Sequence, residues 1–220
     1  MHSGTAAHWD DLEAPFTVCL EQAWTSLGAK GLPVGACLTF DGEIVSSGRN
    51  RVYDPAGGTD PLQGTPIAHA EMNAFATIPR GIDASECELF STQQPCPMCA
   101  GAAEFLEITS IRSLGSDPSD NPGATPWIGD TVGTVWMVLA NTMFIHNVAW
   151  VAGQDNATVV RSREIEPEIA EYALTKLRTR ALIEASEQGM GLGEFVDLIW
   201  RELAEIDERR AIRLAPLAGI

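Results

Sequence analysis

Two short motifs combine side chains that bind a transition metal with one that can move protons. His-Ala-Glu occupies positions 69–71, and Pro-Cys-Pro-Met-Cys occupies positions 95–99. Cys96 and Cys99 are three residues apart, so on the first turn of a helix both sulfur atoms project to one side. Two thiolates and an imidazole supply three ligands for tetrahedral Zn²⁺ and leave the fourth position to water, which is typical of a catalytic zinc. We therefore expect His69, Cys96 and Cys99 to bind zinc.

Glu71 follows the expected ligand His69 by two residues, close to such a water without being a ligand itself. Zinc lowers the pKa of a bound water to about 7. A carboxylate beside it can take the water's proton, pass it to a ring nitrogen and later protonate a departing amino group. The residues predict a hydrolytic deaminase of amino-substituted nitrogen heterocycles, with Glu71 as the catalytic residue.

Other functions fit parts of this pattern. A Cys-x-x-Cys alone is equally typical of a redox pair or of half a structural zinc site. The zinc fold can also serve as a non-catalytic scaffold or regulatory module. The upstream His-x-Glu argues against a redox pair and against a structural zinc site. An intact Glu71 argues against a scaffold, because a scaffold needs the ligands but not the proton shuttle.

Expected helices and strands alternate through the first half of the chain. An amphipathic helix is expected over residues 10–27, followed by two strands joined by Asp-Gly, a strong hairpin signal. A long loop rich in Gly, Pro and Asp covers residues 49–65. The remaining expected elements are a helix over 67–77, a strand over 88–92, a helix that follows Pro95 and runs to about 106, and a strand over 111–115. The alternation predicts an α/β layered domain.

The second half has a different composition. Residues 116–133 indicate an irregular connection that can act as a lid. Residues 132–152 carry no formal charge when His146 is neutral, so a membrane helix has to be considered. Asn141 and His146 inside the run, and no flanking Lys or Arg, favour a buried helix or strand pair with His146 in the core. One helix with a face at 169, 173, 177 and 181, ended by Gly189, and another over 195–206 complete the chain.

The net charge narrows the choice of partner. The chain has 14 Lys and Arg against 30 Asp and Glu, a net charge of -16, and no basic cluster. Nucleic-acid affinity depends largely on Lys and Arg that neutralise phosphates, so we expect small molecules as substrates and nucleic acid as an unlikely partner. No basic region followed by an apolar run opens the sequence, which predicts a cytoplasmic protein without a membrane span. Cys19, Cys37 and Cys87 are expected to be reduced core thiols.

The combination of H-A-E with P-C-x-x-C resembles the signature of the cytidine deaminase superfamily, the zinc deaminases of nucleobases and nucleosides. Further segments at 33–36, 48–50, 69–74 and 94–101 follow the order and rough spacing of the branch that contains guanine deaminases and tRNA adenosine deaminases. The resemblance covers roughly residues 10–120. We accordingly divide the chain into a zinc deaminase core, 1–120, and a mainly helical C-terminal extension, 121–220, packed on that core in the same structural unit.

The resemblance implies a three-layer α/β/α fold with a mixed five-stranded sheet, a homodimer and a role in purine metabolism. It places Asn50, Ala70, Pro95 and Asp117 at the substrate. Asn50 can instead cap a turn, and Asp117 or Asp120 can instead belong to a solvated turn. Trp127, Trp136 and Trp150 can stack on a planar ring, although core positions are the more common use of such residues.

Departures from the family pattern leave the substrate open. The loop after Asn50 is longer than in the tRNA enzymes, Gln93 and Gln94 replace the usual pair before Pro95, and residues 120–220 match no known pattern. Guanine or a related aminopurine or triazine is the first expectation, a cytosine-type nucleoside the second, and tRNA adenosine the alternative.

Overall fold

The first elements of the chain are a helix and a hairpin. The computed structural model describes residue 9 and residues 12–58, 60, 62–115, 134–177 and 181–215. Helix α1 (Ala14–Gly28) leads into strands β1 (Gly35–Phe40) and β2 (Glu43–Arg49), which pair antiparallel. The turn residues Asp41 (φ 51°) and Gly42 (φ 81°) both have the left-handed backbone that a two-residue hairpin turn requires. The hairpin predicted from Asp-Gly is confirmed.

The sheet is mixed and has the order β2-β1-β3-β4. Strand β3 (Glu88–Gln93) pairs antiparallel with β1 and parallel with β4 (Ser110–Gly115). The α/β class is confirmed, but the expectation of five strands is wrong for the described residues, which form four. The uncharged run that left a strand pair open forms helix α4 (Thr134–Ala152) instead, because nineteen residues without Gly or Pro exceed an ordinary strand and suit a buried helix.

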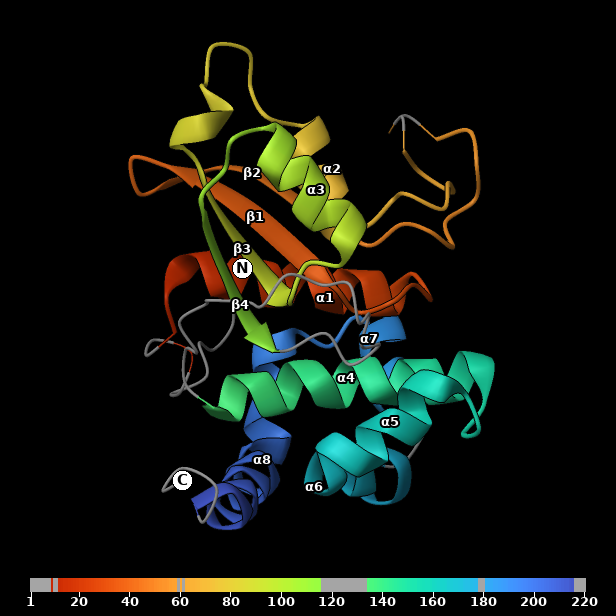
Figure 1. Ribbon diagram of the computed structural model, residues 1–220. Coiled ribbons are helices and arrows are strands. Elements are labelled where there is room, and N and C mark those ends of the chain that lie inside the picture. Colours follow the sequence, from red (N-terminus) through yellow and green to blue (C-terminus); the bar gives the residue numbers. More distant parts are fainter. Residues whose placement is uncertain are drawn as a thin grey trace.

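Helices cover both faces of the sheet (Figure 1). Helices α2 (Ala70–Ala76) and α3 (Pro97–Phe105) pack on one face, and α1 and α4 lie on the other. Alternate residues of β1 follow this division: Ala36 and Leu38 join the core under α2 and α3, whereas Cys37 joins the core under α1 and α4. A 3-10 turn, η2 (Ala84–Glu86), precedes β3.

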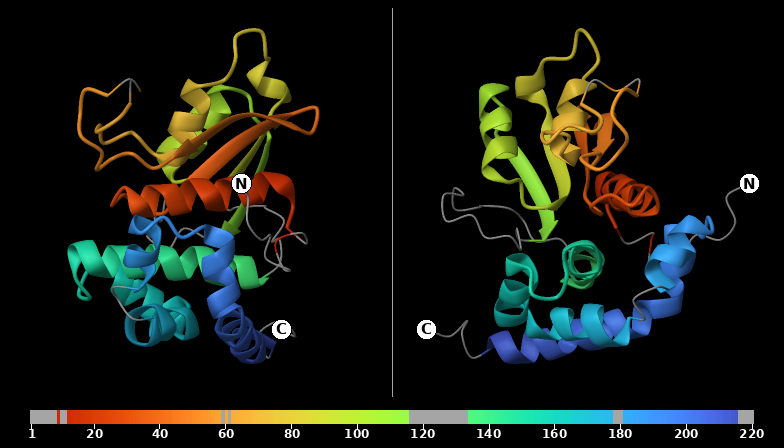
Figure 2. Two further views of the ribbon diagram at one scale, coloured as in Figure 1. Left: turned by 180° about the vertical axis from the view of Figure 1, so that it is seen from behind. Right: turned by 90° about the vertical axis from the view of Figure 1, so that its right-hand side faces the viewer.

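The C-terminal part adds a further helical layer that packs on α4 and α1, seen from two sides in Figure 2. It contains α5 (Ala157–Ile165), α6 (Pro167–Glu171), a π-helical segment η3 (Tyr172–Lys176), α7 (Ala181–Glu187) and α8 (Leu192–Leu214). The predicted single helix ending at Gly189 is wrong. Its backbone turns extended at Leu177 (ψ 105°), whose side chain is buried in the core, and α7 follows as a separate helix.

One apolar core joins the two halves of the chain. It contains Phe16 and Leu20 of α1, Met143 of α4 and Leu203 of α8. Among the described residues one helix, within α4 at Val135–Ala152, is long and apolar enough to cross a membrane, but 67% of that stretch is buried inside the molecule. Core helices pass the same test of length and composition, so this finding is weak evidence for a membrane span.

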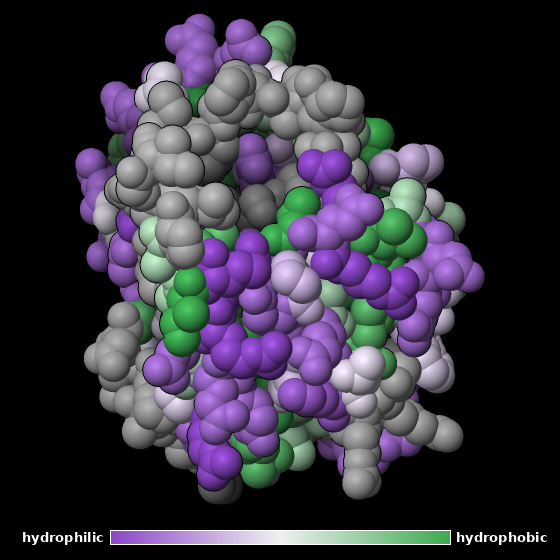
Figure 3. All heavy atoms as spheres, turned by 60° about the horizontal axis from the view of Figure 1, so that its bottom comes forward, coloured by the Kyte–Doolittle hydropathy of each residue, from purple (hydrophilic) through white to green (hydrophobic). Residues whose placement is uncertain are grey.

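The outer face of the C-terminal layer is mainly hydrophilic (Figure 3). Arg210 and Arg213 of α8 form ion pairs with Glu166, and Arg213 also pairs with Glu168. These contacts fasten α8 to α6 and to the segment before it.

Candidate active site and metal centre

The three expected metal ligands converge at the starts of two helices. His69 is the residue before α2 and Cys96 the residue before α3, and both have extended backbone. The helices begin at Ala70 and Pro97, three residues and one residue later than the sequence predicts. The Nδ1 atom of His69 lies 3.5 Å from Cys96 Sγ and 3.6 Å from Cys99 Sγ, and the two sulfur atoms are 3.6 Å apart.

These separations fit one tetrahedral zinc ion. Zn–S bonds of about 2.3 Å and Zn–N bonds of about 2.0–2.1 Å at tetrahedral angles place two sulfur atoms about 3.8 Å apart and a sulfur and a nitrogen about 3.6 Å apart. The three atoms of His69, Cys96 and Cys99 therefore already have the spacing of a zinc coordination sphere. Two sulfurs and one imidazole form a donor set that zinc prefers.

The two cysteines differ in their affinity for protons. Contact with Cys99, supported by His69, lowers the pKa of Cys96 to about 4. The same contact with Cys96, together with burial, raises the pKa of Cys99. One thiolate of the pair is thus favoured by the protein alone, and a dication between the sulfurs favours both.

Glu71 lies beside the ligands on the first turn of α2 and is buried. Its Oε1 accepts a hydrogen bond from the Ser91 hydroxyl at 3.3 Å, and its Oε2 lies 3.5 Å from Cys99 Sγ. Burial raises the pKa of Glu71 above its usual range. A buried carboxylate with a raised pKa next to a metal site has the properties of a general acid and base.

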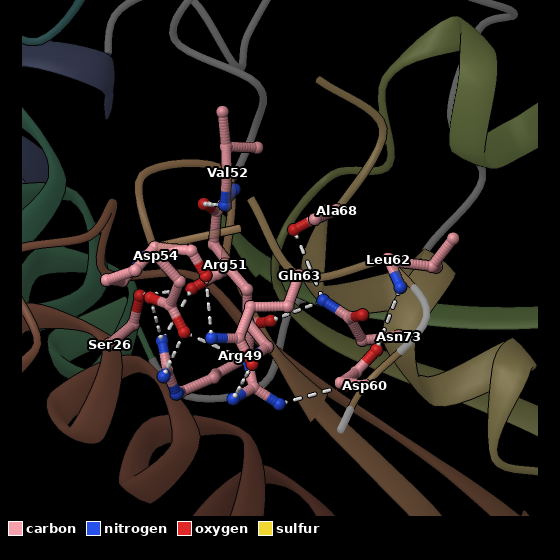
Figure 4. Close-up of polar contacts among 12 residues, drawn as sticks. Ser26, Arg49, Arg51, Val52, Asp54, Asp60, Leu62, Gln63, Ala68 and Asn73 are labelled. Carbon is pink, nitrogen blue, oxygen red and sulfur yellow. Dashed lines mark hydrogen bonds and ion pairs between the residues drawn. The ribbon is translucent and has the colours of Figure 1, made fainter. Parts of the chain in front are cut away.

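A network of ion pairs shapes the long loop between β2 and α2 (Figure 4). The Arg49 guanidinium donates two hydrogen bonds to the Asp54 carboxylate, at 3.0 and 2.6 Å. Arg51 donates to Asp54 at 3.0 Å, to Asp60 at 2.9 Å and to Gln63 at 2.9 Å. The loop is therefore held by charged contacts rather than by a core of its own.

Asn73 of α2 connects the two ends of this loop. Its Nδ2 donates to the carbonyl oxygens of Arg49 at 2.9 Å and Ala68 at 3.2 Å (Figure 4). Asn50 and His69 follow those two carbonyls directly in sequence. The amide of Asn73 thus holds the residue that the resemblance assigns to the substrate next to a metal ligand.

A cavity of about 310 Å³ opens on this centre, within the usual size range of small-molecule sites. Its inner side is formed by residues within or next to the ends of β2 and β3 and the starts of α2 and α3: Asn50, His69, Glu71, Gln93, Gln94 and Cys96. Its outer wall is mostly apolar and is made by Leu32, Val34, Tyr53, Phe144, Val148, Val151, Ala152, Asn156 and Thr158. The last six belong to α4, to α5 and to the turn between them. No Lys or Arg is among the described residues of the lining.

Residues 10–113 match the family model of the cytidine and deoxycytidylate deaminase zinc-binding region. The tRNA-specific adenosine deaminase of Aquifex aeolicus is 32% identical over 136 residues, which are 60% of this chain and 79% of that protein. The chain belongs to the cytidine deaminase-like family of zinc deaminases. The matched region ends within β4, so α4 and α5, which form the outer cavity wall, lie outside the family's zinc-binding region.

Relatives within this family carry different names. The guanine deaminase of Bacillus subtilis is 35% identical over 84 residues, 37% of this chain and 49% of that protein. The tRNA(Ile)-lysidine synthase of Deinococcus radiodurans is 34% identical over 131 residues, 58% of this chain but only 21% of that protein. The chain thus spans less than two thirds of the length of several relatives that it matches, and the names of these relatives point to different activities.

The structure places the sequence-predicted substrate residues differently from one another. Asn50 lines the cavity, and its Oδ1 also accepts from Val52 N at 3.2 Å, so the turn-capping alternative holds beside the cavity position. Ala70 and Pro95 are buried and are absent from the described lining. Asp117, Asp120 and Trp127 lie outside the described residues.

Sequence reasoning missed most of the outer wall. Phe144 and Val148 come from the uncharged run, for which the sequence predicts only a buried helix or strand pair. Trp136 packs in the core with Trp9 and Trp200, and Trp150 is exposed. His146 is buried, with Nδ1 3.1 Å from the carbonyl oxygen of Ala173, as a core histidine requires. The sequence feature that indicated this wall is the uninterrupted length of the uncharged run. That length predicts burial of the run, but it does not predict which part of the molecule the run packs against.

Proposed function

We propose that this chain is a hydrolytic deaminase that converts an amino-substituted nitrogen heterocycle to the carbonyl product and ammonia, and that the substrate enters as a free base or similarly small ring. The observation that carries the proposal is the meeting of His69, Cys96 and Glu71 in one cavity of small-molecule size. In the overall reaction, water supplies the oxygen that replaces the amino group, and the nitrogen leaves as ammonia.

The zinc ligands, Glu71 and Ser91 have different roles in this reaction. His69, Cys96 and Cys99 would hold a zinc ion, which would lower the pKa of a water molecule enough for it to act as a nucleophile at neutral pH. Glu71 takes a proton from the attacking water and delivers a proton to the departing amine, and its burial places these transfers away from bulk solvent. Ser91 holds Oε1 of Glu71, and Oε2 lies on the side of the metal ligand Cys99.

The charge around the cavity favours a small neutral substrate. The described lining contains no cationic side chain. The two arginines of the neighbouring loop, Arg49 and Arg51, are engaged by Asp54 and Asp60. A polynucleotide needs cations free to pair with its phosphates, and a net charge of -16 acts against it.

A tRNA substrate is the second candidate, because the Aquifex aeolicus relative that aligns over 79% of its length is named a tRNA-specific adenosine deaminase. A basic patch elsewhere on the surface would be needed to bind the RNA. The two candidates make opposite predictions about salt, since phosphate contacts weaken steeply as ionic strength rises.

The test is an ammonia-release screen with the zinc-loaded full chain. The panel contains guanine, adenine, cytosine, their nucleosides, aminotriazines and pterins, together with a tRNA. We expect turnover of a free ring that changes little between low and moderate salt. Turnover of the tRNA alone, falling steeply with salt, would replace the first candidate by the second. Release from no compound, with zinc bound, would favour a non-catalytic zinc scaffold.

A further inference from the structure

Gln93 is the last residue of β3, and its side-chain amide makes no hydrogen bond within the described fold. It is 4% exposed, and neither Oε1 nor Nε2 of its amide has a hydrogen-bond partner among the residues that the structure describes. The side chain lines the cavity together with His69, Glu71 and Cys96. A buried amide without partners costs free energy, so its presence at this cavity calls for a group that arrives from outside.

No other described residue of the lining has this combination. Several buried polar side chains elsewhere also contain an unpartnered atom, among them Asn73, Thr142 and Asn147, but they do not line the cavity. Asn50, which does line it, has its Oδ1 satisfied by Val52 N. Among the described lining residues, Gln93 is the buried side chain whose amide brings both a free acceptor and a free donor to the site.

The neighbouring backbone leaves room for this amide. The ends of β3 and β4 meet α4 (Figure 1), and Gln93 pairs with Gly115 across the two strands. A Cβ atom on Gly115 would lie 2.6 Å from Asn141 Oδ1 and 3.2 Å from Gln93 Oε1. Glycine at this position therefore gives space to two amides, one from β3 and one from α4.

An amide forms two parallel hydrogen bonds only with an edge that presents a donor beside an acceptor. The reacting amidine of a deaminase substrate faces Glu71 and the metal ligands. A lactam, with N–H next to C=O, offers a second edge of this kind on the same ring, which matches Oε1 as acceptor and Nε2 as donor. A ring that lacks such an edge leaves at least one atom of the buried amide unpaired.

We propose that Gln93 determines specificity by hydrogen-bonding the lactam edge of the substrate, and that the substrates are amino rings that also carry a lactam, such as guanine or cytosine, rather than adenine-type rings. The inference rests on the deaminase function proposed above and names its substrate class. Gln93 touches no reacting atom in this assignment, so it selects the ring and leaves proton transfer to Glu71.

The test uses two pairs of rings that differ only in the lactam: guanine against 2-aminopurine, and cytosine against 4-aminopyrimidine. Binding to the zinc-loaded Glu71→Ala protein is measured by calorimetry, so turnover does not interfere. We expect the lactam member of at least one pair to bind more tightly. Gln93→Met, which keeps the length but removes both polar atoms, should weaken binding of that member by about 10- to 100-fold and leave its partner nearly unchanged.

Two further variants serve as a second test of the Gln93 amide and as a control. Gly115→Ala, which should displace the same amide, is expected to reduce the same discrimination if Gln93→Met fails to fold. Gln22→Met, at a half-buried glutamine of α1 that donates to Ser47, should leave the discrimination intact. Zinc content is measured for every variant.

The proposal is overturned if neither lactam ring is preferred over its partner, if none of the four rings binds, or if Gln93→Met and Gly115→Ala keep the parental preference. These outcomes are separable from failure of the deaminase function. Ammonia release from any ring, abolished by Glu71→Ala alone, upholds deamination even when Gln93 has no role. Lack of release from every ring removes deamination of free rings whatever the binding data show.

Discussion

The hydroxyl of Ser91 donates to Oε1 of Glu71 at 3.3 Å, which ties the expected proton shuttle of α2 to strand β3. Both side chains are buried, and β3 is an inner strand, paired with β1 on one side and β4 on the other. The carboxylate is therefore held by the most enclosed part of the sheet rather than by a loop.

Removal of that hydroxyl should slow the reaction without loss of the metal. Ser91→Ala leaves one carboxylate oxygen without its neutral hydrogen bond, worth about 0.5–1.5 kcal/mol, so we expect kcat to fall by about 3- to 10-fold. Zinc content should stay at the parental level. Ser46→Ala, at another buried serine that donates to Ala74 O, is the control for loss of a buried hydroxyl. Equal kcat in the two variants would remove the role given to Ser91.

Glu71→Ala should retain zinc and lose nearly all turnover. A positioned general acid and base contributes about 10²–10⁴-fold to the rate, and Glu71 is the buried carboxylate beside the ligands. Ammonia release and metal analysis of the same preparation give both values. Glu86→Ala, at the exposed turn before β3, should match the parent. Deamination by Glu71→Ala at the parental rate would contradict the mechanism.

The freshly purified protein should contain one zinc ion per chain, bound by His69, Cys96 and Cys99. Cys99→Ser replaces a buried soft ligand, so we expect loss of most of the zinc and of the activity, and a lower Tm. Cys87→Ser, at a buried cysteine outside the ligand set, should keep the metal. Protein that holds no zinc and gains no activity when zinc is added would count against the whole assignment.

The outer wall should act on substrate binding rather than on the chemical step. Phe144→Ala removes an aromatic side chain that lines the cavity, and burial of such a side chain is worth about 1.5–3 kcal/mol. Since the contact is the same in the ground and transition states, KM should rise by about 10-fold or more with kcat nearly unchanged. Phe105→Ala, at an 87% exposed position on α3, is the matched control. A fall in kcat with constant KM would show that the wall acts on the reaction itself.

Asp54 should make stability sensitive to acid. Burial alone would raise the pKa of this carboxyl, but hydrogen bonds from Arg49 and Arg51 outweigh it and lower the pKa below its usual value. Arg51 also holds Asp60, so four charged groups share the network. A lowered pKa in the folded state means that the stabilisation is complete above the unfolded value of about 3.9 and is lost as pH falls through the folded value.

Asp54→Asn should therefore cost about 2–3 kcal/mol near pH 7, because it breaks a buried ion pair. The difference in Tm between parent and variant should be constant near neutrality and shrink below about pH 4. Asp155→Asn, at an exposed position, should show no such trend. A gap that widened on acidification would have the wrong sign for this network.

The zinc ligands and Glu71 were predictable because their relationships are local. The three-residue spacing of Cys96 and Cys99 and the two-residue step from His69 to Glu71 each place side chains within one helix start, whatever the rest of the chain does. The hairpin at Asp41 and Gly42 is local in the same way, because a two-residue turn depends only on the backbone preferences of its own residues.

Only the tertiary structure decided what encloses this centre. The uncharged run has no period that singles out one face, so its sequence predicted burial without naming Phe144 as a cavity wall. The break at Leu177, between η3 and α7, likewise follows from burial of this residue against distant helices. The amide of Gln93 lacks a partner among the described residues because of its tertiary surroundings. Contacts among β3, β4 and α4 join residues far apart in the chain, and no local sequence pattern contains such contacts.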